Sequence, residues 1–201
     1  MSVWTEYGWY CTDVYGGLSQ AEKESNASKA MTALRQHGFT IYAAAGVVGN
    51  MWAESQLNPA QWEDGTPYSG GYGLVQWTPW SDYWPWPAGS TDWLNNGPRQ
   101  MERLIYERDN NLEFWHSQQT MPGWTWTRFC NISPGPGETA NDAVNLAAEV
   151  FVYRYLAPAD PSGSLSNRQY HARYVYQHCP GSVIPPWLLL WWNNKNRKVI
   201  K

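Results

Sequence analysis

Apolar residues recur at helical spacing in several stretches of the chain, and each stretch predicts a helix. The first predicted helix covers residues 26–37, where Asn26 is placed to cap the start and Gly38 to follow the end. A capping-box pattern, Ser19-x-x-Glu22, can add a turn ahead of it. The residues before 26 are aromatic and irregular, and we expect them to pack on the neighbouring domain as a lead-in.

The second predicted helix runs from Thr40, as N-cap, to about Ser55, and Asn58-Pro59 stops it. Small residues dominate its sequence, namely Ala43, Ala44, Ala45, Gly46 and Gly49. Small side chains let helices approach each other closely. This helix is therefore expected in the core.

Further helices are predicted in the second half of the chain. One begins near Pro98 and carries a stripe formed by Met101, Leu104, Ile105, Leu112 and Trp115. The next is capped by Thr139 or Asn141 and extends to about Leu156, with Pro158 ending it. The last predicted helix covers residues 166–178.

Between residues 60 and 97 the helical pattern gives way to glycine, proline, serine and tryptophan. The turn signals Asp64-Gly65 and Gly70-Gly71 indicate a loop or small hairpin lobe. We expect an α+β fold that is mainly helical, with this lobe inserted between the second and third helices and a cleft between the two parts. The predicted organisation is a lead-in over 1–25, a catalytic domain over 26–178 and an apolar, then basic tail over 179–201.

Composition narrows the class of ligand. The chain of 201 residues contains 15 Trp, 13 Tyr and 4 Phe, while charged residues make up 15%. Dense aromatic residues with few charges favour a flat, uncharged, amphipathic ligand such as a sugar ring, although core packing explains most individual tryptophans. The net charge of −3 argues against a nucleic acid partner, because phosphate backbones are bound by clustered Lys and Arg.

The sequence does not indicate a membrane-spanning segment, a secretory signal or a metal site. The longest apolar run, 184–192, is far shorter than the roughly 20 residues that span a membrane. The N-terminal residues lack the pattern of a secretory signal. Cys11, Cys130 and Cys179 allow either one long-range disulfide, such as Cys130 with Cys179, or three free thiols. The cysteine and histidine spacings predict no metal site, and we expect no cofactor.

Glu54 is the first candidate for chemistry. It ends a helix of apolar and small residues, next to Trp52 and just before the irregular lobe. A carboxylic acid among apolar neighbours, or at the negative end of a helix, has a raised pKa and can hold a proton near neutral pH. Cleavage of a glycosidic bond needs such a general acid. The alternative is a solvated residue that ends the helix.

The residues around Glu54 carry a family resemblance. Gly49-Asn-Met-Trp-Ala-Glu54-Ser-Gln-Leu-Asn58-Pro59, followed by Gly70-Gly-Tyr-Gly-Leu-Val-Gln76-Trp-Thr78, resembles the E-S-x-x-N-P and G-L-x-Q pair of the lysozyme superfamily. The match is closer to the phage tail lysozyme-like family, whose pattern fits Ala43 to Ser55 and Gly71 to Thr78. The resemblance covers roughly residues 26–178.

This resemblance implies a lysozyme fold that cleaves the glycan strands of bacterial peptidoglycan, with Glu54 as the catalytic acid. It implies that Gln76 lines the cleft and bonds a sugar substituent, and that Ser55 orients the carboxyl group. Gly71 and Gly73 would keep the strand near the substrate free of Cβ bulk. The aromatic residues expected to bind substrate are Trp62, Tyr72 and Trp77.

A second carboxylate is less certain from the sequence. Asp64, our predicted partner for Glu54, lies in the lobe beside Glu63, and either could act as base or nucleophile. Asp64-Gly65 is equally an ordinary turn signal. Without a second carboxylate, Tyr72 or Gln76 could hold a water, or the substrate's own 6-hydroxyl could attack. Glu107 and Glu149 are expected to form salt bridges or lie on polar helix faces.

The sequence thus predicts a muramidase-type hydrolase that cuts the MurNAc-GlcNAc β-1,4 bond during phage tail-mediated wall penetration or host lysis. It would reside in the virion tail, or in the host cytoplasm before release, and could contact other tail proteins through its termini. One alternative is a lytic transglycosylase that leaves 1,6-anhydro ends. Another is a non-catalytic sugar-binding or structural tail module.

Overall fold

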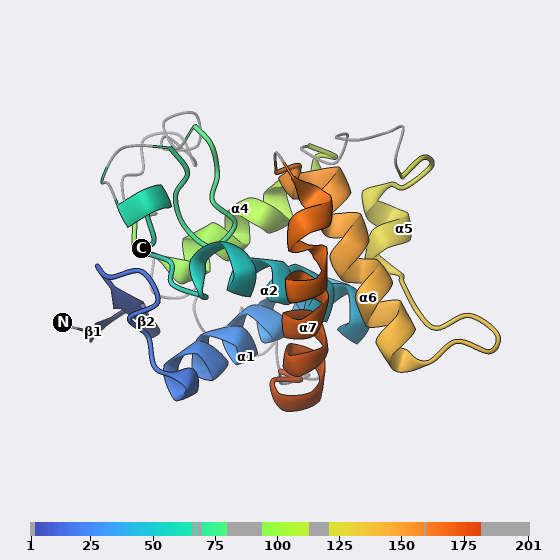
Figure 1. The fold of residues 1–201 in the computed structure, drawn as a ribbon, viewed down its shortest axis with the longest axis horizontal. Helices are drawn as coiled ribbons and strands as arrows, with labels where there is room; N and C mark the ends of the chain where they lie inside the picture. Colours follow the sequence, from blue (N-terminus) through green and yellow to red (C-terminus); the bar gives the residue numbers. More distant parts are fainter. Residues whose placement is uncertain are drawn as a thin grey trace, which may run out of the picture.

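The computed structural model describes residues 3–65, 67, 70–79, 94–112, 121–158 and 160–181. These residues form a mainly helical domain with one small sheet, in agreement with the predicted α+β class (Figure 1). The helices are α1 (Gln20–Gln36), α2 (Ile41–Ser55), α4 (Gly97–Asp109), α5 (Trp126–Cys130), α6 (Ala140–Phe151) and α7 (Pro161–His178). The described residues also include strands β1 (Val3–Glu6) and β2 (Trp9–Thr12), the 3-10 turn η1 (Glu63–Gly65) and the π-helical turn η2 (Val152–Leu156).

Helix α2 is the centre of the domain, and α6 and α7 pack against it (Figure 1). Its two glycines lie at these contacts, Gly46 against Ala147 of α6 and Gly49 against Ala172 of α7. A Cβ atom at either glycine would collide with the facing helix. The small residues of α2 therefore permit close helix packing, as predicted, and this packing fixes the end of α2 that carries Glu54.

Helix α1 begins earlier than predicted. Ser19 is its N-cap, and Ser19 and Glu22 form the reciprocal bonds of a capping box, so the helix starts at Gln20. The prediction of Asn26 as N-cap is wrong, because Asn26 is fully buried inside the helix. Its side chain bonds the backbone N–H and C=O of Tyr10 and the C=O of Leu57. The boundary that we placed after residue 25 therefore falls within α1.

The N-terminal segment is a hairpin where we had expected irregular structure. Strands β1 and β2 pair antiparallel, and β2 is largely buried. Asn58 holds β2 to the domain, because its side chain accepts from the Thr12 N–H at 3.3 Å and donates to the Thr12 C=O at 2.7 Å. Trp9 is 4% exposed, and its ring occupies the space next to Gly97.

The caps predicted for α2 and α6, Thr40 and Thr139, are both present. Helix α4 has a proline in its first turn as predicted but ends at Asp109, so Leu112 lies beyond it and is exposed. The helical stretch that begins with α6 continues through η2 to Leu156, where we had predicted its end. Helix α7 begins at Pro161, several residues before the predicted start, because Asp160 caps it. Trp115 lies outside the described residues.

The inserted lobe is a short, irregular hairpin over its described part. Tyr72 pairs with both Trp62 and Trp77 through isolated bridges, which confirms the predicted loop or hairpin lobe. Four tryptophans of the predicted lobe lie outside the described residues, namely Trp80, Trp84, Trp86 and Trp93. Most of the predicted C-terminal tail, from residue 182 onward, lies outside them too.

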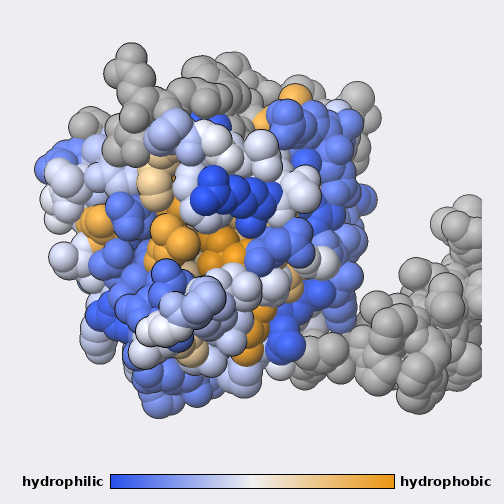
Figure 2. Space-filling view, turned by 90° about the vertical axis from the view of Figure 1, so that its right-hand side faces the viewer, coloured by the Kyte–Doolittle hydropathy of each residue, from blue (hydrophilic) through white to orange (hydrophobic). Residues whose placement is uncertain are grey.

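The structure bears on three questions from the sequence, namely a disulfide, a membrane-spanning helix and a metal site. All three cysteines are free and buried, so no disulfide links them, and burial raises the pKa of Cys11 to about 12 and of Cys130 to about 11. No helix among the described residues is long and apolar enough to cross a membrane. In the same part of the chain, no group of three acidic, cysteine or histidine side chains is placed to hold a metal ion. Figure 2 shows the face that lies to the right in Figure 1, where hydrophilic residues surround a small hydrophobic area.

Candidate active site

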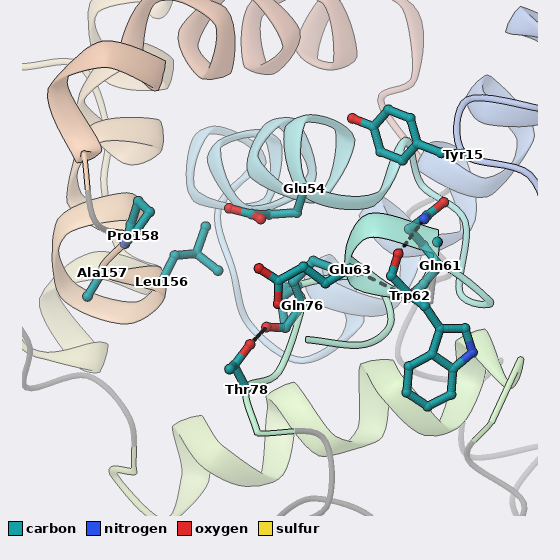
Figure 3. Close-up of a pocket in the computed structure, with 12 residues that line it drawn as sticks. Tyr15, Glu54, Gln61, Trp62, Glu63, Gln76, Thr78, Leu156, Ala157 and Pro158 are labelled. Carbon is teal, nitrogen blue, oxygen red and sulfur yellow. Dashed lines mark hydrogen bonds between the residues drawn. The ribbon is translucent and has the colours of Figure 1, made fainter. Parts of the chain in front are cut away.

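A pocket of about 710 Å³ opens beside the C-terminal end of α2 (Figure 3). Four parts of the fold line the pocket. They are the last turn of α2, the inserted lobe, the end of η2 with the turn that follows it, and the segment after β2, which contributes one side chain. The residues that line it are Tyr15, Glu54, Gln61, Trp62, Glu63, Gly65, Val75, Gln76, Thr78, Leu156, Ala157 and Pro158. The predicted cleft between helical domain and lobe is thus present.

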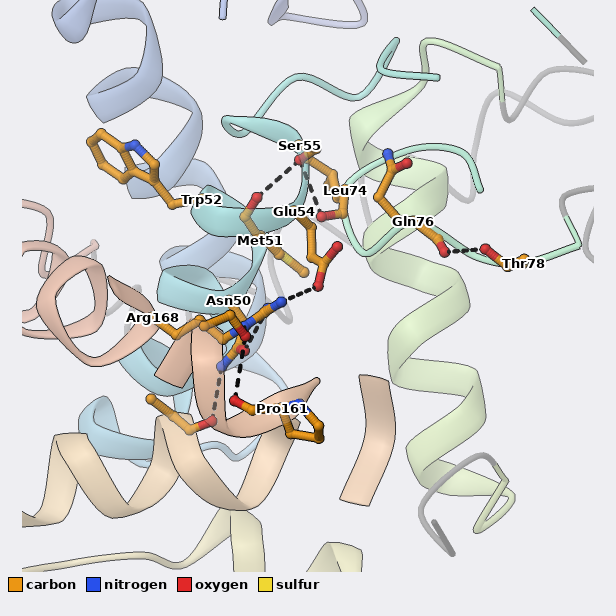
Figure 4. A network of polar contacts seen from close by, with 12 residues as sticks. Asn50, Met51, Trp52, Glu54, Ser55, Leu74, Gln76, Thr78, Pro161 and Arg168 are labelled. Carbon is orange, nitrogen blue, oxygen red and sulfur yellow. Dashed lines mark hydrogen bonds and ion pairs between the residues drawn. The ribbon is translucent and has the colours of Figure 1, made fainter. Parts of the chain in front are cut away.

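Glu54 points into this pocket from the last turn of α2 (Figure 3). Its side chain is 18% exposed, so solvent and ligand can reach it. Its Oε1 forms an ion pair with Nη2 of Arg168 at 2.6 Å (Figure 4). We had expected apolar neighbours around this carboxyl group, whereas the structure places a buried cation against it.

Arg168 is itself held by the two helices that it joins. Arg168 lies on α7 and is 5% exposed. Its Nε donates to Ser164 Oγ of the same helix at 2.9 Å, and its Nη1 donates to Asn50 Oδ1 of α2 at 3.0 Å. Asn50 lies one turn before Glu54 on α2, and its Nδ2 donates to the carbonyls of Gly46 and Ala148. Each nitrogen of the guanidinium therefore has a partner, and Nη2 is aimed at Glu54.

The contact of Arg168 with Glu54 was not predicted from the sequence. Its pairing joins residues more than a hundred positions apart, and no periodic pattern reports such a contact. The available signals were local. Asn50 and Glu54 share one face of a helix at i, i+4 spacing, as do Ser164 and Arg168, and polar residues at these positions interrupt apolar faces.

Glu63 brings a second carboxylate to the same pocket. It lies in η1, and its Oε2 accepts a hydrogen bond from the backbone N–H of Gly71 at 2.6 Å. Glu63 also packs so closely on Gly70 that a Cβ atom there would collide with its carboxyl group. Figure 3 shows Glu54 and Glu63 directed into one cavity. Asp64 is the next residue of η1, and its side chain lies outside the described part of the structure.

Gln76 and Trp62 line the pocket at the positions expected of substrate-binding residues. Nε2 of Gln76 donates to the carbonyls of Gln61 at 3.1 Å and Gly73 at 2.9 Å. Both bonds use the nitrogen, so the side-chain oxygen is the part of Gln76 that can accept from a ligand. Trp62 is half-buried and packs on Tyr72 with ring centroids 4.2 Å apart.

The structure corrects the roles predicted for Ser55 and Gly73. Ser55 is fully buried, and its hydroxyl donates to the carbonyls of Met51 at 3.0 Å and Leu74 at 3.1 Å (Figure 4). It therefore ties the end of α2 to the lobe, and it does not bond the Glu54 carboxyl. Gly73 has a φ of +82°, and a Cβ atom there would collide with Gln100, so internal packing explains this glycine.

Tyr72 and Trp77 are likewise internal. Tyr72 is fully buried, and its hydroxyl donates to Asn95 at 2.9 Å. Trp77 is 4% exposed, and its Nε1 donates to the Tyr155 hydroxyl at 3.1 Å. The predicted contact of these two rings with substrate is corrected, because both rings form the core of the lobe.

The contact between Trp77 and Tyr155 continues to a buried acid. The Tyr155 hydroxyl donates to Glu107, and Nε of Arg103 lies 2.5 Å from the same carboxylate. Glu107 is fully buried, and its ion pair confirms the salt-bridging role expected from the sequence. This chain of contacts fastens the lobe to η2 and α4.

Comparison with known proteins identifies the family. Residues 25–178 match the phage tail lysozyme family. The chain belongs to this family. The lysozyme-like α+β fold that its motifs implied is thereby confirmed, and this membership supports a lysozyme-like function in a phage.

A curated relative of the chain is Morphogenesis protein 1 of Bacillus phage B103. The two sequences are 32% identical over 147 residues, which cover 72% of the chain and 37% of the relative. The chain therefore spans little more than a third of that protein's length. The family match begins at residue 25, so the N-terminal hairpin and Tyr15 precede it.

A half-buried histidine lies close to Arg168 on α7. His171 follows Arg168 by one turn of α7 and stacks on Trp52, with ring centroids 5.2 Å apart and planes 8° from parallel. Burial, and secondarily the positive charge of Lys23, lower the pKa of His171 to about 4. The folded protein thus keeps this imidazole neutral over a pH range in which an exposed histidine is protonated.

We expect this histidine to make the fold less stable in mild acid. The pKa is about 6.5 in the unfolded chain and about 4 in the folded protein, so the unfolded state binds more protons between these values. Stability is therefore fully present above pH 6.5 and is lost as the pH falls toward 4, by roughly 1–2 kcal/mol after allowing for solvent screening. Denaturant unfolding of wild type and His171→Gln across this range measures the effect. A variant whose stability declines as steeply as that of wild type contradicts it.

Proposed function

We propose that this chain is a peptidoglycan glycosidase that cleaves the MurNAc-GlcNAc β-1,4 bond, with Glu54 as general acid. The observation that carries the proposal is the pair of carboxylates, Glu54 and Glu63, that share one pocket at the junction of helical domain and lobe. Glycosidic cleavage uses such a pair, one group as acid and the other as base or nucleophile. Family membership supplies the substrate class, the glycan strand of the bacterial wall.

The geometry suggests how Glu54 would act. Arg168 bonds Oε1, so Oε2 is the oxygen available to carry a proton to the leaving glycosidic oxygen. The partial exposure of Glu54 lets it exchange protons with solvent between turnovers. A carboxyl group held in one orientation can deliver its proton along a fixed line, which is how positioning lowers a barrier.

The remaining pocket residues would bind the glycan and supply the second carboxylate. Gln76 offers its side-chain oxygen, and Trp62 offers part of an aromatic face. Glu63 is our first choice as base or nucleophile because it lines the pocket, and Asp64 remains the alternative. A role in the virion tail, in wall penetration or host lysis, accords with the family. Contacts with other tail proteins through the termini belong to the same proposal.

One observation favours a second candidate function. The relative from phage B103 is named for morphogenesis, which describes assembly rather than catalysis. Under that reading the chain would be a structural tail module that retains a lysozyme fold and binds glycan without cutting it.

Digestion of purified sacculi distinguishes these functions. We expect soluble muropeptides with reducing MurNAc ends, because a second carboxylate in the pocket favours attack by water. Mass spectrometry of the products is the measurement. Anhydro-muramyl ends would instead show a lytic transglycosylase, in which the substrate's 6-hydroxyl attacks. Intact sacculi to which the protein binds would show a non-catalytic module.

A further inference from the structure

One wall of the pocket comes from outside the region that the family shares. Tyr15 lines the cavity together with Glu54, yet it lies in the segment between β2 and α1, ahead of residue 25. The Tyr15 side chain is 62% exposed, unlike the buried aromatic residues of the lobe. A large exposed aromatic ring at the edge of a pocket is a stronger sign of ligand binding than a single aromatic ring on an open surface.

The turn that carries Tyr15 is well defined. The Gly17 N–H donates to the Val14 carbonyl at 2.9 Å, and the Val14 N–H donates to Thr12 Oγ1 at 3.2 Å. Gly16 has a φ of +70°, and a Cβ atom on Gly17 would crowd Thr12 and Val14. The turn therefore needs both glycines, and its hydrogen bonds fix the backbone on each side of Tyr15.

The same turn is connected to the segment that follows Glu54. Thr12 is bonded on both its N–H and its C=O by the side chain of Asn58, and both residues are buried. Asn58 lies four positions after Glu54, in the E-S-x-x-N-P motif itself. The hairpin is thus held in a fixed position relative to the proposed acid, and Tyr15 keeps its place in the pocket wall.

The two ends of the pocket differ in chemistry. In Figure 3 Glu54 lies between Tyr15 on one side and the turn of Leu156, Ala157 and Pro158 on the other. Trp62 and Gln61 lie on the side of Tyr15. Gln61 is itself 4% exposed, and its Nε2 donates to the Trp62 carbonyl at 2.6 Å. This end therefore offers the exposed aromatic ring of Tyr15, and the opposite end is lined by aliphatic residues.

We propose that Tyr15 forms part of a subsite for one pyranose ring of the glycan strand, so that the N-terminal hairpin extends the cleft beyond the family's domain. The inference rests on the proposed function for its ligand. The C–H face of a pyranose is apolar, which matches the exposed aromatic ring of Tyr15 in the pocket wall. Contacts of an aromatic face are worth on the order of 1 kcal/mol, which corresponds to about a five- to tenfold change in affinity.

Binding measurements without turnover test the subsite. The parent is the full chain with Glu54→Gln, and the probes are the β-1,4-linked N-acetylglucosamine hexasaccharide, titrated by calorimetry, and sacculi, used in co-sedimentation. Adding Tyr15→Ala is expected to raise the Kd for the hexasaccharide about five- to tenfold. Tyr15→Phe keeps the ring and should bind within about twofold of the parent.

Tyr7→Asn is the matched control. Tyr7 is 56% exposed in the turn of the same hairpin and does not line the pocket, and asparagine tolerates its φ of +49°. This control should leave the Kd unchanged. Equal affinities of the Tyr15→Ala protein and its parent would overturn the subsite, and so would a parent that binds neither probe. A loss in Tyr15→Phe as large as in Tyr15→Ala would also overturn it, because the ring would then not be what binds.

The test of the subsite can fail or succeed independently of the test of the proposed glycosidase activity. Cleavage of sacculi by wild type with no effect of Tyr15→Ala on binding removes the subsite and leaves the glycosidase. Intact sacculi after treatment with wild type, together with weaker hexasaccharide binding in Tyr15→Ala, supports the subsite and removes the glycosidase.

Discussion

Glutamine in place of Glu54 is expected to lower the rate of sacculus digestion by about 10²-fold or more, the usual scale of a general-acid contribution. The amide cannot donate a proton to the leaving oxygen, while its carbonyl oxygen can still accept the bond from Arg168. Because shape and most polar contacts are conserved, binding to sacculi should be retained. Release of soluble muropeptides gives the rate, and co-sedimentation with sacculi gives the binding.

The fold of this variant must be checked, because the substitution leaves the Arg168 charge without its anionic partner. Removing one member of a partly buried ion pair is destabilising. Activity is therefore compared well below the measured Tm, and only a folded variant with lost activity supports the proposal. Digestion at the wild-type rate would falsify the assignment of Glu54 as the acid.

Variants of the second carboxylate extend the comparison. Glu63→Gln is expected to reduce digestion strongly if Glu63 is the base or nucleophile, with Asp64→Asn as the matched change at the next residue of η1. Full activity of Asp64→Asn removes Asp64 from the mechanism. The reverse pattern, with Asp64 required and Glu63 dispensable, would exchange their roles.

Local sequence predicted the helical frame well because caps and spacing act within a few residues. Thr40 and Thr139 cap the helices that their positions indicated, and the glycines of α2 lie at helix contacts. Asn26 shows the limit. Its side chain can cap a helix, but the capping box at Ser19 starts α1 earlier, and Asn26 is then buried to hold the hairpin.

The pocket was predictable only in part, for a related reason. A motif combines residues that act on substrate with residues that shape the backbone, and the sequence does not separate them. Glu54 and Gln76 line the pocket, whereas Ser55 and Gly73 serve packing. Arg168 was not predicted because its contact with Glu54 depends on the packing of α7 against α2.

Tyr15 escaped prediction for the same reason. It reaches the pocket only through the docking of the hairpin on Asn58. Its aromatic, irregular surroundings gave no local signal of that contact.

The second large effect is expected at Arg168. Arg168→Met should lower kcat about 10- to 100-fold with little change in KM, because the carboxyl of Glu54 loses the group that fixes its orientation. Arg168 does not line the pocket, so ground-state binding should be largely preserved. We regard Arg168 as a positioning residue that acts through Glu54.

Two further variants distinguish positioning from general stability. Arg168→Lys keeps the charge but cannot bond Ser164, Asn50 and Glu54 in the planar geometry of a guanidinium, so it should recover only part of the lost kcat. Arg173→Met is the matched control, because Arg173 also lies on α7 and bonds Asn145 at 2.5 Å, away from the pocket. If stability alone were at stake, the Arg168 and Arg173 variants would lose activity in proportion to their fall in Tm. Loss of kcat confined to Arg168, with partial recovery by lysine, is what positioning requires, because the Arg168 guanidinium contacts the carboxyl of Glu54 whereas that of Arg173 bonds Asn145.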